Sequence, residues 1–153
     1  MKIRIKDKPF WRLYTEVKIE NPHTGEVGSA KAVWDTGATN SGIRKDVVEG
    51  LGLKEESKTL LRSINATTQT GWYKCRLLIE EEHPITLDVL LVPDMEDAHF
   101  VIGMDVISKG DFSLKHNRSG GLTFEFTFRN SKKSSFLSLL KNILKTFGGN
   151  MKI

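Results

Sequence analysis

The chain has 153 residues, of which 39% are hydrophobic, and a formal net charge of +4. This length supports one domain with a packed core, and the apolar fraction is too high for a disordered chain. No apolar run approaches the ~20 residues of a membrane-spanning helix, and the N-terminus lacks the roughly 7–15-residue apolar stretch of a secretory signal.

The cysteine and histidine content narrows the possible chemistry. The single cysteine, Cys75, excludes an intrachain disulfide and a cysteine-based zinc site, which favours a reducing cytoplasm as the location. Its place within an alternating strand is typical of a small core residue rather than a nucleophile. The four histidines are scattered and none lies at metal-ligand spacing, so we expect no metal and no cofactor.

The positive charge lies at the two ends of the chain. Residues 1–12 carry five basic residues and one acid, residues 131–153 carry five lysines and no acid, and residues 13–130 sum to −5. Basic ends on a mildly acidic body are typical of solvated termini. They do not form the basic stripe with interleaved aromatic side chains that a nucleic-acid groove needs, so we expect no nucleic-acid partner.

Alternation of apolar and polar side chains predicts strands near the start of the chain. Trp11 to Glu20 alternates with a period of two residues, and Ser29 to Asp35 is a second strand that becomes apolar toward its end. The segment 21–26 between them is dense in turn residues. After Gly42, the stretch from Ile43 to Leu51 suits a short helix.

The middle of the chain has the pattern of a long hairpin. Strands are predicted for Ser57 to Ile64 and for Trp72 to Glu80, on either side of a polar tip at residues 65–71. The next strand, Ile85 to Val92, is nearly continuous in apolar residues, so we expect it to be buried on both faces.

The later segments continue the β pattern. His99 to Ile102 is a short apolar strand, and a helical turn is expected over Met104 to Ser108. Asp111 to Lys115 and Leu122 to Phe128 are strands separated by a turn. Short strands that recur with turn signals between them predict a mainly β domain, closed or folded over on itself, at residues 1–130.

Residues 131–153 differ from this pattern and are expected to form a basic, amphipathic, helical C-terminal extension. The helix could dock on its own domain, pack between subunits or lie on a membrane surface. A modest lysine content without an aromatic belt argues against the membrane. The apolar side chains that fall at helical spacing are Phe136, Leu137, Leu139, Leu140, Ile143, Leu144 and Phe147.

The sharpest chemical signal is the segment 32–39. Three apolar residues lead into Asp35, and Thr36-Gly37-Ala38 follows. An apolar approach places a carboxylate at the end of a buried strand, where desolvation and neighbouring groups tune its pKa. A glycine next to it lets a substrate backbone come close. The alternative is that the segment is an ordinary turn without a catalytic role, since Asp, Thr and Gly are also residues that favour turns.

A second segment favours the functional interpretation. Val101-Ile102-Gly103, followed by a short helix, lies 68 positions downstream of Asp35, counted to Gly103. Together the two segments resemble the retropepsin-like aspartic proteases, a single-domain family with one Asp-Thr-Gly motif per chain and a flap hairpin in mid-sequence. The resemblance covers about residues 11–128. It implies a small, closed, barrel-like acid protease fold with short helices.

The resemblance also implies roles for single residues. Asp35 matches the catalytic aspartate, Thr36 the residue whose hydroxyl ties two catalytic loops together, and Gly37 the residue whose carbonyl meets the substrate. Ala38 completes the motif at the substrate. The remaining residues that the resemblance places at the substrate are Val101 and Ile102, together with a flap tip made of Asn65, Ala66, Thr67, Thr68, Gln69, Thr70 and Gly71.

The chain departs from the family at several positions. The flap tip lacks the glycine-rich pair of viral members. Met104 stands where many members have an arginine, and Thr39 and Asn40 stand where that arginine's acidic partner is often found. Both halves of this brace are absent, so another interaction is expected to replace it. Asp105 is expected to be a charge at a helix end, and Trp72 either covers substrate or packs within a strand.

One aspartate per chain predicts a homodimer, because this route of peptide hydrolysis needs one ionised and one protonated carboxyl. A chain of 153 residues is also too short for a two-lobed enzyme that carries both halves of the site. The sequence therefore predicts an aspartic endopeptidase that acts on a peptide or protein substrate, with one Asp35 from each copy. The alternative is a dimerisation or peptide-binding module of the same fold without significant proteolysis.

Overall fold

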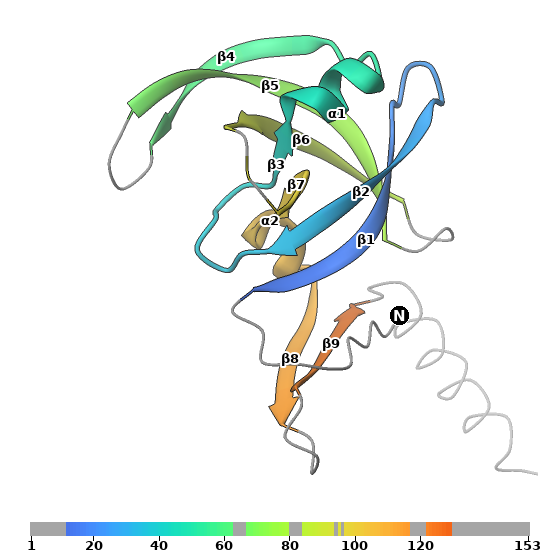
Figure 1. The fold of residues 1–153 in the computed structure, drawn as a ribbon, viewed down its shortest axis with the longest axis vertical. Coiled ribbons are helices and arrows are strands. Elements are labelled where there is room, and N and C mark those ends of the chain that lie inside the picture. Colours follow the sequence, from blue (N-terminus) through green and yellow to red (C-terminus); the bar gives the residue numbers. More distant parts are fainter. Residues whose placement is uncertain are drawn as a thin grey trace, which may run out of the picture.

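The computed structural model describes residues 12–62, 67–79, 84–93, 95, 97–116 and 122–129, and Figure 1 shows how their strands and helices are arranged. The described residues are mainly β, as the alternating patterns predict. The strands are β1 (Leu13–Glu20), β2 (Val27–Trp34), β3 (Gly42–Arg44), β4 (Glu55–Arg62), β5 (Thr67–Leu78), β6 (Ile85–Val92), β7 (Phe100–Ile102), β8 (Gly110–His116) and β9 (Leu122–Phe128), and the helices are α1 (Lys45–Gly50) and α2 (Met104–Ile107).

Seven strands form one strongly curved sheet in the order β1-β2-β7-β3-β6-β5-β4. Strand β1 also pairs with β5, from Lys18 opposite Leu78 to Glu20 opposite Arg76. This pairing brings the sheet back on itself, while β4 stays outside the ring. Among the described residues three residue pairs close the ring, so closure of the barrel is only partial.

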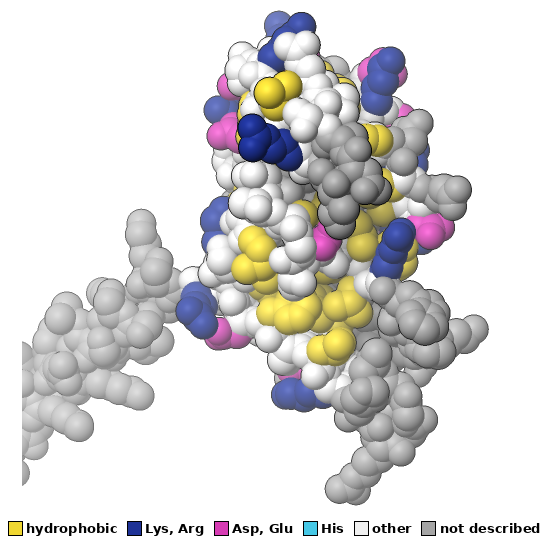
Figure 2. All heavy atoms as spheres, turned by 90° about the vertical axis from the view of Figure 1, so that its left-hand side faces the viewer, with side chains coloured by type: hydrophobic (Ala, Val, Ile, Leu, Met, Phe, Trp, Pro, Cys, Tyr) yellow, Lys and Arg dark blue, Asp and Glu magenta, His cyan; other side chains and the backbone are white. Residues whose placement is uncertain are grey.

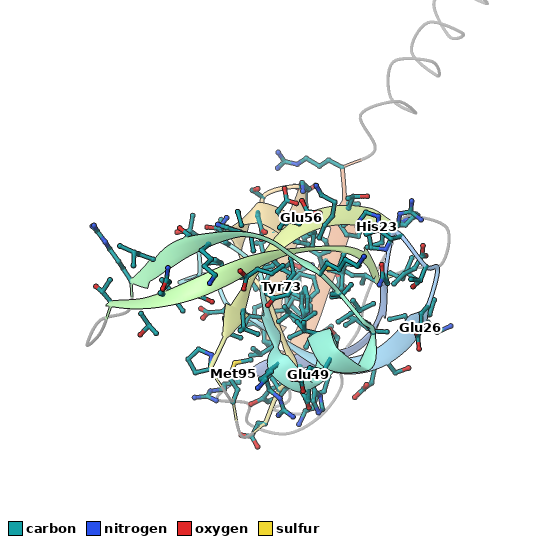
Figure 3. All side chains as sticks on the ribbon, turned by 90° about the horizontal axis from the view of Figure 1, so that it is seen from above. His23, Glu26, Glu49, Glu56, Tyr73 and Met95 are labelled. Carbon is teal, nitrogen blue, oxygen red and sulfur yellow. The ribbon has the colours of Figure 1, made fainter. Side chains whose placement is uncertain are left out.

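The core lies inside this curved sheet. Side chains of β1, β2 and β5 are buried at alternate positions, as a period of two requires, and all three residues of β7 are buried. Tyr73 of β5 lies near the centre in the view from above, whereas Glu26 lies at the margin (Figure 3). Burial raises the pKa of the Tyr73 hydroxyl, with the nearby Glu55 carboxylate adding to the effect. Fully buried members of the core include Ile19, Ala32, Ile43, Leu77, Val89, Phe100, Ile102, Val106 and Phe126.

Strands β8 and β9 form a separate two-stranded sheet below the main one (Figure 1). The aromatic side chains of this hairpin pack on Trp34, the last residue of β2. The Trp34 ring lies 5.0 Å from that of Phe124 and 4.8 Å from that of Phe126, measured between centroids. The hairpin is thereby anchored directly beside the start of the Asp-Thr-Gly segment.

Several expectations from the sequence need correction. Strand β6 is not buried on both faces, because Thr86 and Asp88 point to solvent and Asp88 pairs with Lys74 of β5 at 3.3 Å. The expected helix after Gly42 is divided between β3 and α1, since Ile43 pairs with β6 and β7. The expected helix within residues 131–153 lies outside the described residues.

The hairpin of β4 and β5 is also longer than expected. Thr67 to Gly71, predicted as part of its tip, belong to β5 and pair with Arg62 to Lys58 of β4. The polar side chains of this stretch resemble a loop by composition, but the ladder with β4 continues through them. Residues 63–66, which connect the two strands, lie outside the described part of the chain.

Candidate active site

Asp35 lies directly beyond the last residue of β2. Its backbone N–H donates to the carbonyl of Ile102 at 3.0 Å, so β7 holds the point where the chain leaves the sheet. One carboxylate oxygen, Oδ1, accepts a hydrogen bond of 2.8 Å from the N–H of Gly37. The carboxylate is therefore oriented by its own loop, while Asp35, Thr36 and Gly37 are all exposed in the single chain.

The short strand β7 positions this loop. It runs parallel to β2, with Trp34 opposite Ile102, and antiparallel to β3, with Gly42 opposite Val101. All three residues of β7 are buried. Because this buried three-residue strand lies between the two ends of the loop, the loop residues around Asp35 have little conformational freedom.

Helix α2 holds the far side of the same loop. The N–H of Met104 donates to the carbonyl of Ala38 at 2.8 Å, and the N–H of Asp105 to that of Thr39 at 3.2 Å. Gly103, directly before the helix, lies very close to the loop. A Cβ atom at this position would be 2.6 Å from the Asn40 carbonyl carbon. Only a residue without a side chain allows this approach.

A buried network joins Ser41 to α2. The Ser41 hydroxyl donates to Oδ1 of Asp105 at 2.7 Å, the Ser41 N–H donates to Oδ2 at 3.0 Å, and the hydroxyl accepts from the N–H of Gly103 at 3.1 Å. Ser41 has no exposed surface. Both oxygens of Asp105 are therefore used to hold the loop. Asp105 and Ser41 directly follow Met104 and Asn40, positions at which the arginine brace is absent.

A groove of about 510 Å³ opens beside Asp35. Residues 37–40 of the loop form one wall, and Leu90, Val92 and Val101 form its apolar base. The hairpin of β4 and β5 lies over it, through Thr59–Arg62 and Trp72. The charged groups of this lining are Asp35 and Arg62, so the groove suits an extended chain with apolar side chains next to Asp35.

The predicted substrate-binding residues lie in different places. Ala38 and Val101 line the groove, whereas Ile102 has no exposed surface and acts through its carbonyl. Asn65 and Ala66 lie outside the described residues. Thr68, Gln69 and Thr70 line another hollow of about 280 Å³, which adjoins the groove through Leu61 and Val92. Thr67 and Gly71 line neither cavity.

The groove residues that the sequence did not single out come mainly from β4. Thr59 to Arg62 were predicted as strand residues, and alternation along that strand is weak because most of β4 is exposed. Leu60 is 60% exposed, although it faces the groove. Trp72, left open between a covering and a packing role, lines the groove while half-buried.

A second hollow, of about 590 Å³, adjoins the groove through Asn40 and Trp72. Its wall carries the ion pairs of Lys74 with Glu56 at 3.5 Å and with Asp88 at 3.3 Å. The Asp88 carboxylate raises the pKa of Lys74, so this ammonium stays charged. The groove beside Asp35 therefore continues into a more polar region.

The described residues contain no group of three or more His, Cys, Asp or Glu side chains that could hold a metal ion. Within the same part of the chain, no helix is both long and apolar enough to cross a membrane. The chemistry available beside the groove is that of a single exposed carboxylate with a backbone donor on one oxygen. Water activation between carboxyls requires a second carboxyl at the same place.

Comparison with known proteins gives matches among solved structures. No family model and no curated protein matches the chain. The protease of simian foamy virus is 18% identical, with a TM-score of 0.42, over 61% of this chain and 92% of that one. A retropepsin-like aspartic protease from Rickettsia conorii is 13% identical, with a TM-score of 0.43, over 78% and 98%.

The retroviral protease-like domain of Ddi1 from Leishmania major is 18% identical, with a TM-score of 0.48, over 82% of this chain and 99% of that domain. All three are of the kind that the Asp35 and Val101-Ile102-Gly103 segments resemble. In its fold, the chain is similar to the retropepsin-like aspartic proteases.

Proposed function

We propose that the chain is an aspartic endopeptidase that acts as a homodimer, with one Asp35 carboxyl from each copy. The observation that carries this proposal is the position of Asp35. Its carboxylate is exposed at the edge of a peptide-sized groove, under a hairpin, on a loop held by β7 and α2. An exposed carboxylate that is held in place at a strand end suits a reaction in which a second copy of the chain supplies its own Asp35 carboxyl.

The reaction uses the two carboxyls in different protonation states. Two carboxyls that share one site cannot both ionise at low cost, so one keeps its proton; paired aspartates of aspartic proteases are the known case. The ionised carboxylate takes a proton from a water between them as that water attacks the peptide carbonyl. The protonated carboxyl hydrogen-bonds the carbonyl oxygen. The N–H of Gly37 keeps the Asp35 carboxylate in the orientation that this step needs.

The groove supports an extended peptide as the substrate. Leu60, Leu90 and Val101 give it apolar surface in the same groove as Asp35. The β4–β5 hairpin covers the groove as a flap, and its strand residues supply most of that cover. We expect cleavage between apolar side chains, because burial of such side chains is the main binding energy that this lining offers.

The test is hydrolysis of a diverse peptide pool by purified full-length protein and by Asp35→Asn. Asparagine keeps the shape but cannot share the proton, so we expect the cleavage rate to fall by at least about 100-fold with the fold intact. Asp97→Asn is the matched control, since Asp97 is also exposed but lies outside the groove. Equal cleavage by wild type and Asp35→Asn would overturn the assignment.

The homodimer is tested by dilution. Each copy holds half of the site, so specific activity should fall below the dimer dissociation constant, and sedimentation should show a dimer where cleavage is seen. A fully active monomer would refute the mechanism. Peptides that bind the wild-type dimer without being cleaved would instead make the chain a peptide-binding module.

A further inference from the structure

The β4–β5 hairpin leaves the body of the sheet at one defined point. Strand β5 pairs with β6 from Leu77 back to Trp72, which lies opposite Leu90. Among the described residues, Thr67 to Gly71 pair with β4 only. In Figure 1 the two strands extend beyond the rest of the sheet. The position of the hairpin over the groove therefore depends on how it is held at this point.

Burial along β5 begins at the same point. The first three residues of the strand are exposed, whereas the fourth, Thr70, is 9% exposed. The Thr70 hydroxyl donates a hydrogen bond of 2.5 Å to the carbonyl of Leu91 in β6. A side chain thus continues the contact between the hairpin and β6 where the backbone ladder has stopped. A buried hydroxyl and a carbonyl that lose such a bond are left without a partner, which is costly.

Little packing holds the hairpin beside this bond. The hollow of about 280 Å³ lies between the hairpin and the end of β6, lined by Leu61 and Thr70 on one side and by Leu91 and Pro93 on the other. No residue of β4 is buried. Because side chains do not fill this space, the bond from Thr70 to Leu91 has to fix the distance between the hairpin and β6.

The acceptor belongs to the part of the molecule that carries Asp35. Leu91 pairs with Ile43 of β3, the strand that follows the Asp35 loop. The N–H of the neighbouring Leu90 donates to the carbonyl of Ser41 at 3.1 Å, and Ser41 joins the loop to α2. The Thr70 hydroxyl therefore ties the hairpin to the framework that also holds the Asp35 loop.

The angle of the hairpin decides how the groove is covered. Residues 59–62 of β4 and Trp72 of β5 line the groove beside Asp35. Figure 2 shows the face toward which the hairpin extends in Figure 1, and hydrophobic side chains gather in the middle and lower part of this face, below the level of the hairpin. A hairpin that moves away from β6 takes its share of the groove lining with it.

We propose that Thr70 is a positioning residue for peptide hydrolysis, whose hydroxyl holds the β4–β5 hairpin over the groove through the Leu91 carbonyl. The inference rests on the proposed function, and it places Thr70 at the base of the hairpin rather than at its tip. Substrate binds well only to molecules in which the hairpin covers the groove, so the apparent affinity falls with the fraction of such molecules. The Asp35 loop is held separately by β7 and α2, so the rate after binding is kept.

The kinetic test compares Thr70→Val, which keeps the shape and loses the hydroxyl, with Thr70→Ser, which keeps the hydroxyl. Thr127→Val is the matched control, because it is the same substitution at an exposed threonine of β9, in the other sheet. Hydrolysis is measured at concentrations at which the wild type is dimeric. Since one hydrogen bond is lost, we expect Thr70→Val to raise KM roughly 2- to 10-fold with little change in kcat. Thr70→Ser should restore most of the wild-type KM, and Thr127→Val should leave it unchanged.

Hydrogen exchange of the unliganded proteins follows the same bond without depending on catalysis. We expect Thr70→Val to exchange at least about two-fold faster at the end of the β5–β6 ladder, around Trp72 and Leu90, because the hairpin separates from β6 more often. Exchange in β1 should stay as slow as in the wild type. Thr70→Ser and Thr127→Val should resemble the wild type in both places.

The other outcomes are distinguishable. Wild-type exchange in Thr70→Val would overturn the role of the hydroxyl, and faster exchange with an unchanged KM would show a bond that does not influence the substrate and also overturn the proposal. Faster exchange throughout the chain, β1 included, would show a general loss of stability and count against it equally. A folded wild type that cleaves no peptide would overturn the proposed function, while exchange would still decide whether the hydroxyl holds the hairpin. If circular dichroism shows that Thr70→Val is unfolded, Thr70→Ala takes its place in both measurements.

Discussion

Gly103→Ala tests whether the close contact between α2 and the Asp35 loop matters. A Cβ at this position would lie 2.6 and 2.7 Å from the carbonyl carbon and oxygen of Asn40 and 2.9 Å from the N of Ser41. These atoms are backbone, so the loop or the helix has to move. The backbone of Gly103, at φ −92° and ψ −173°, is open to any residue. The penalty is therefore steric.

Its size follows from what overpacking costs. An added methyl in a closely packed site destabilises a protein by about 1–3 kcal/mol. For a chain of this length each kcal/mol lowers the melting temperature by about 2–4 °C, so a fall of roughly 2–12 °C is expected. Because the displaced atoms belong to the Asp35 loop, peptide hydrolysis per folded molecule should also fall, since ~1 Å of misplacement can cost about 100-fold.

The assay is thermal unfolding followed by circular dichroism, with hydrolysis measured well below the transition. Gly50→Ala, at the end of α1, is the control, because nothing lies within 4 Å of a Cβ there and its φ is not positive. It should be neutral or stabilising by up to about 1 kcal/mol. A Gly103→Ala protein that melts and cleaves like Gly50→Ala would refute the argument that this contact positions Asp35.

Three further outcomes are expected. Ser41→Ala should lower the free energy of unfolding in urea by about 1–3 kcal/mol, because the buried N–H of Gly103 loses its acceptor; unchanged stability would contradict the network. The hydrogen bond from Arg44 lowers the pKa of Asp46, so their pairing stabilises the fold at neutral pH and is lost as the pH falls through that lowered pKa. Asp46→Asn should therefore be less stable than wild type at pH 7, by under about 1 kcal/mol for this half-exposed carboxylate, with the gap closing at acid pH; a gap independent of pH would argue against the pairing. Burial raises the pKa of the Cys75 thiol to about 12, so iodoacetamide at pH 8 should label unfolded but not native protein; fast labelling of native protein would contradict this burial.

Local patterns in the sequence were enough to predict most strands. Alternation from Trp11 to Glu20 predicted β1, and the runs Asp111–Lys115 and Leu122–Phe128 predicted β8 and β9 to within a residue. The apolar approach to Asp35 predicted a carboxylate at a strand end. These predictions hold because period and turn chemistry are properties of neighbouring residues, which the chain carries before it folds.

Only the tertiary structure decided which distant segments meet. Ser41 and Asp105 are 64 positions apart, and nothing in their own neighbourhoods indicates that both oxygens of Asp105 hold the Asp35 loop. The parallel pairing of Trp34 with Ile102, and the exposed end of β8 at Leu114, are likewise results of how whole strands pack. Such contacts depend on which apolar faces pack against one another. The pattern along one segment predicts its own secondary structure but not the distant segment with which it pairs.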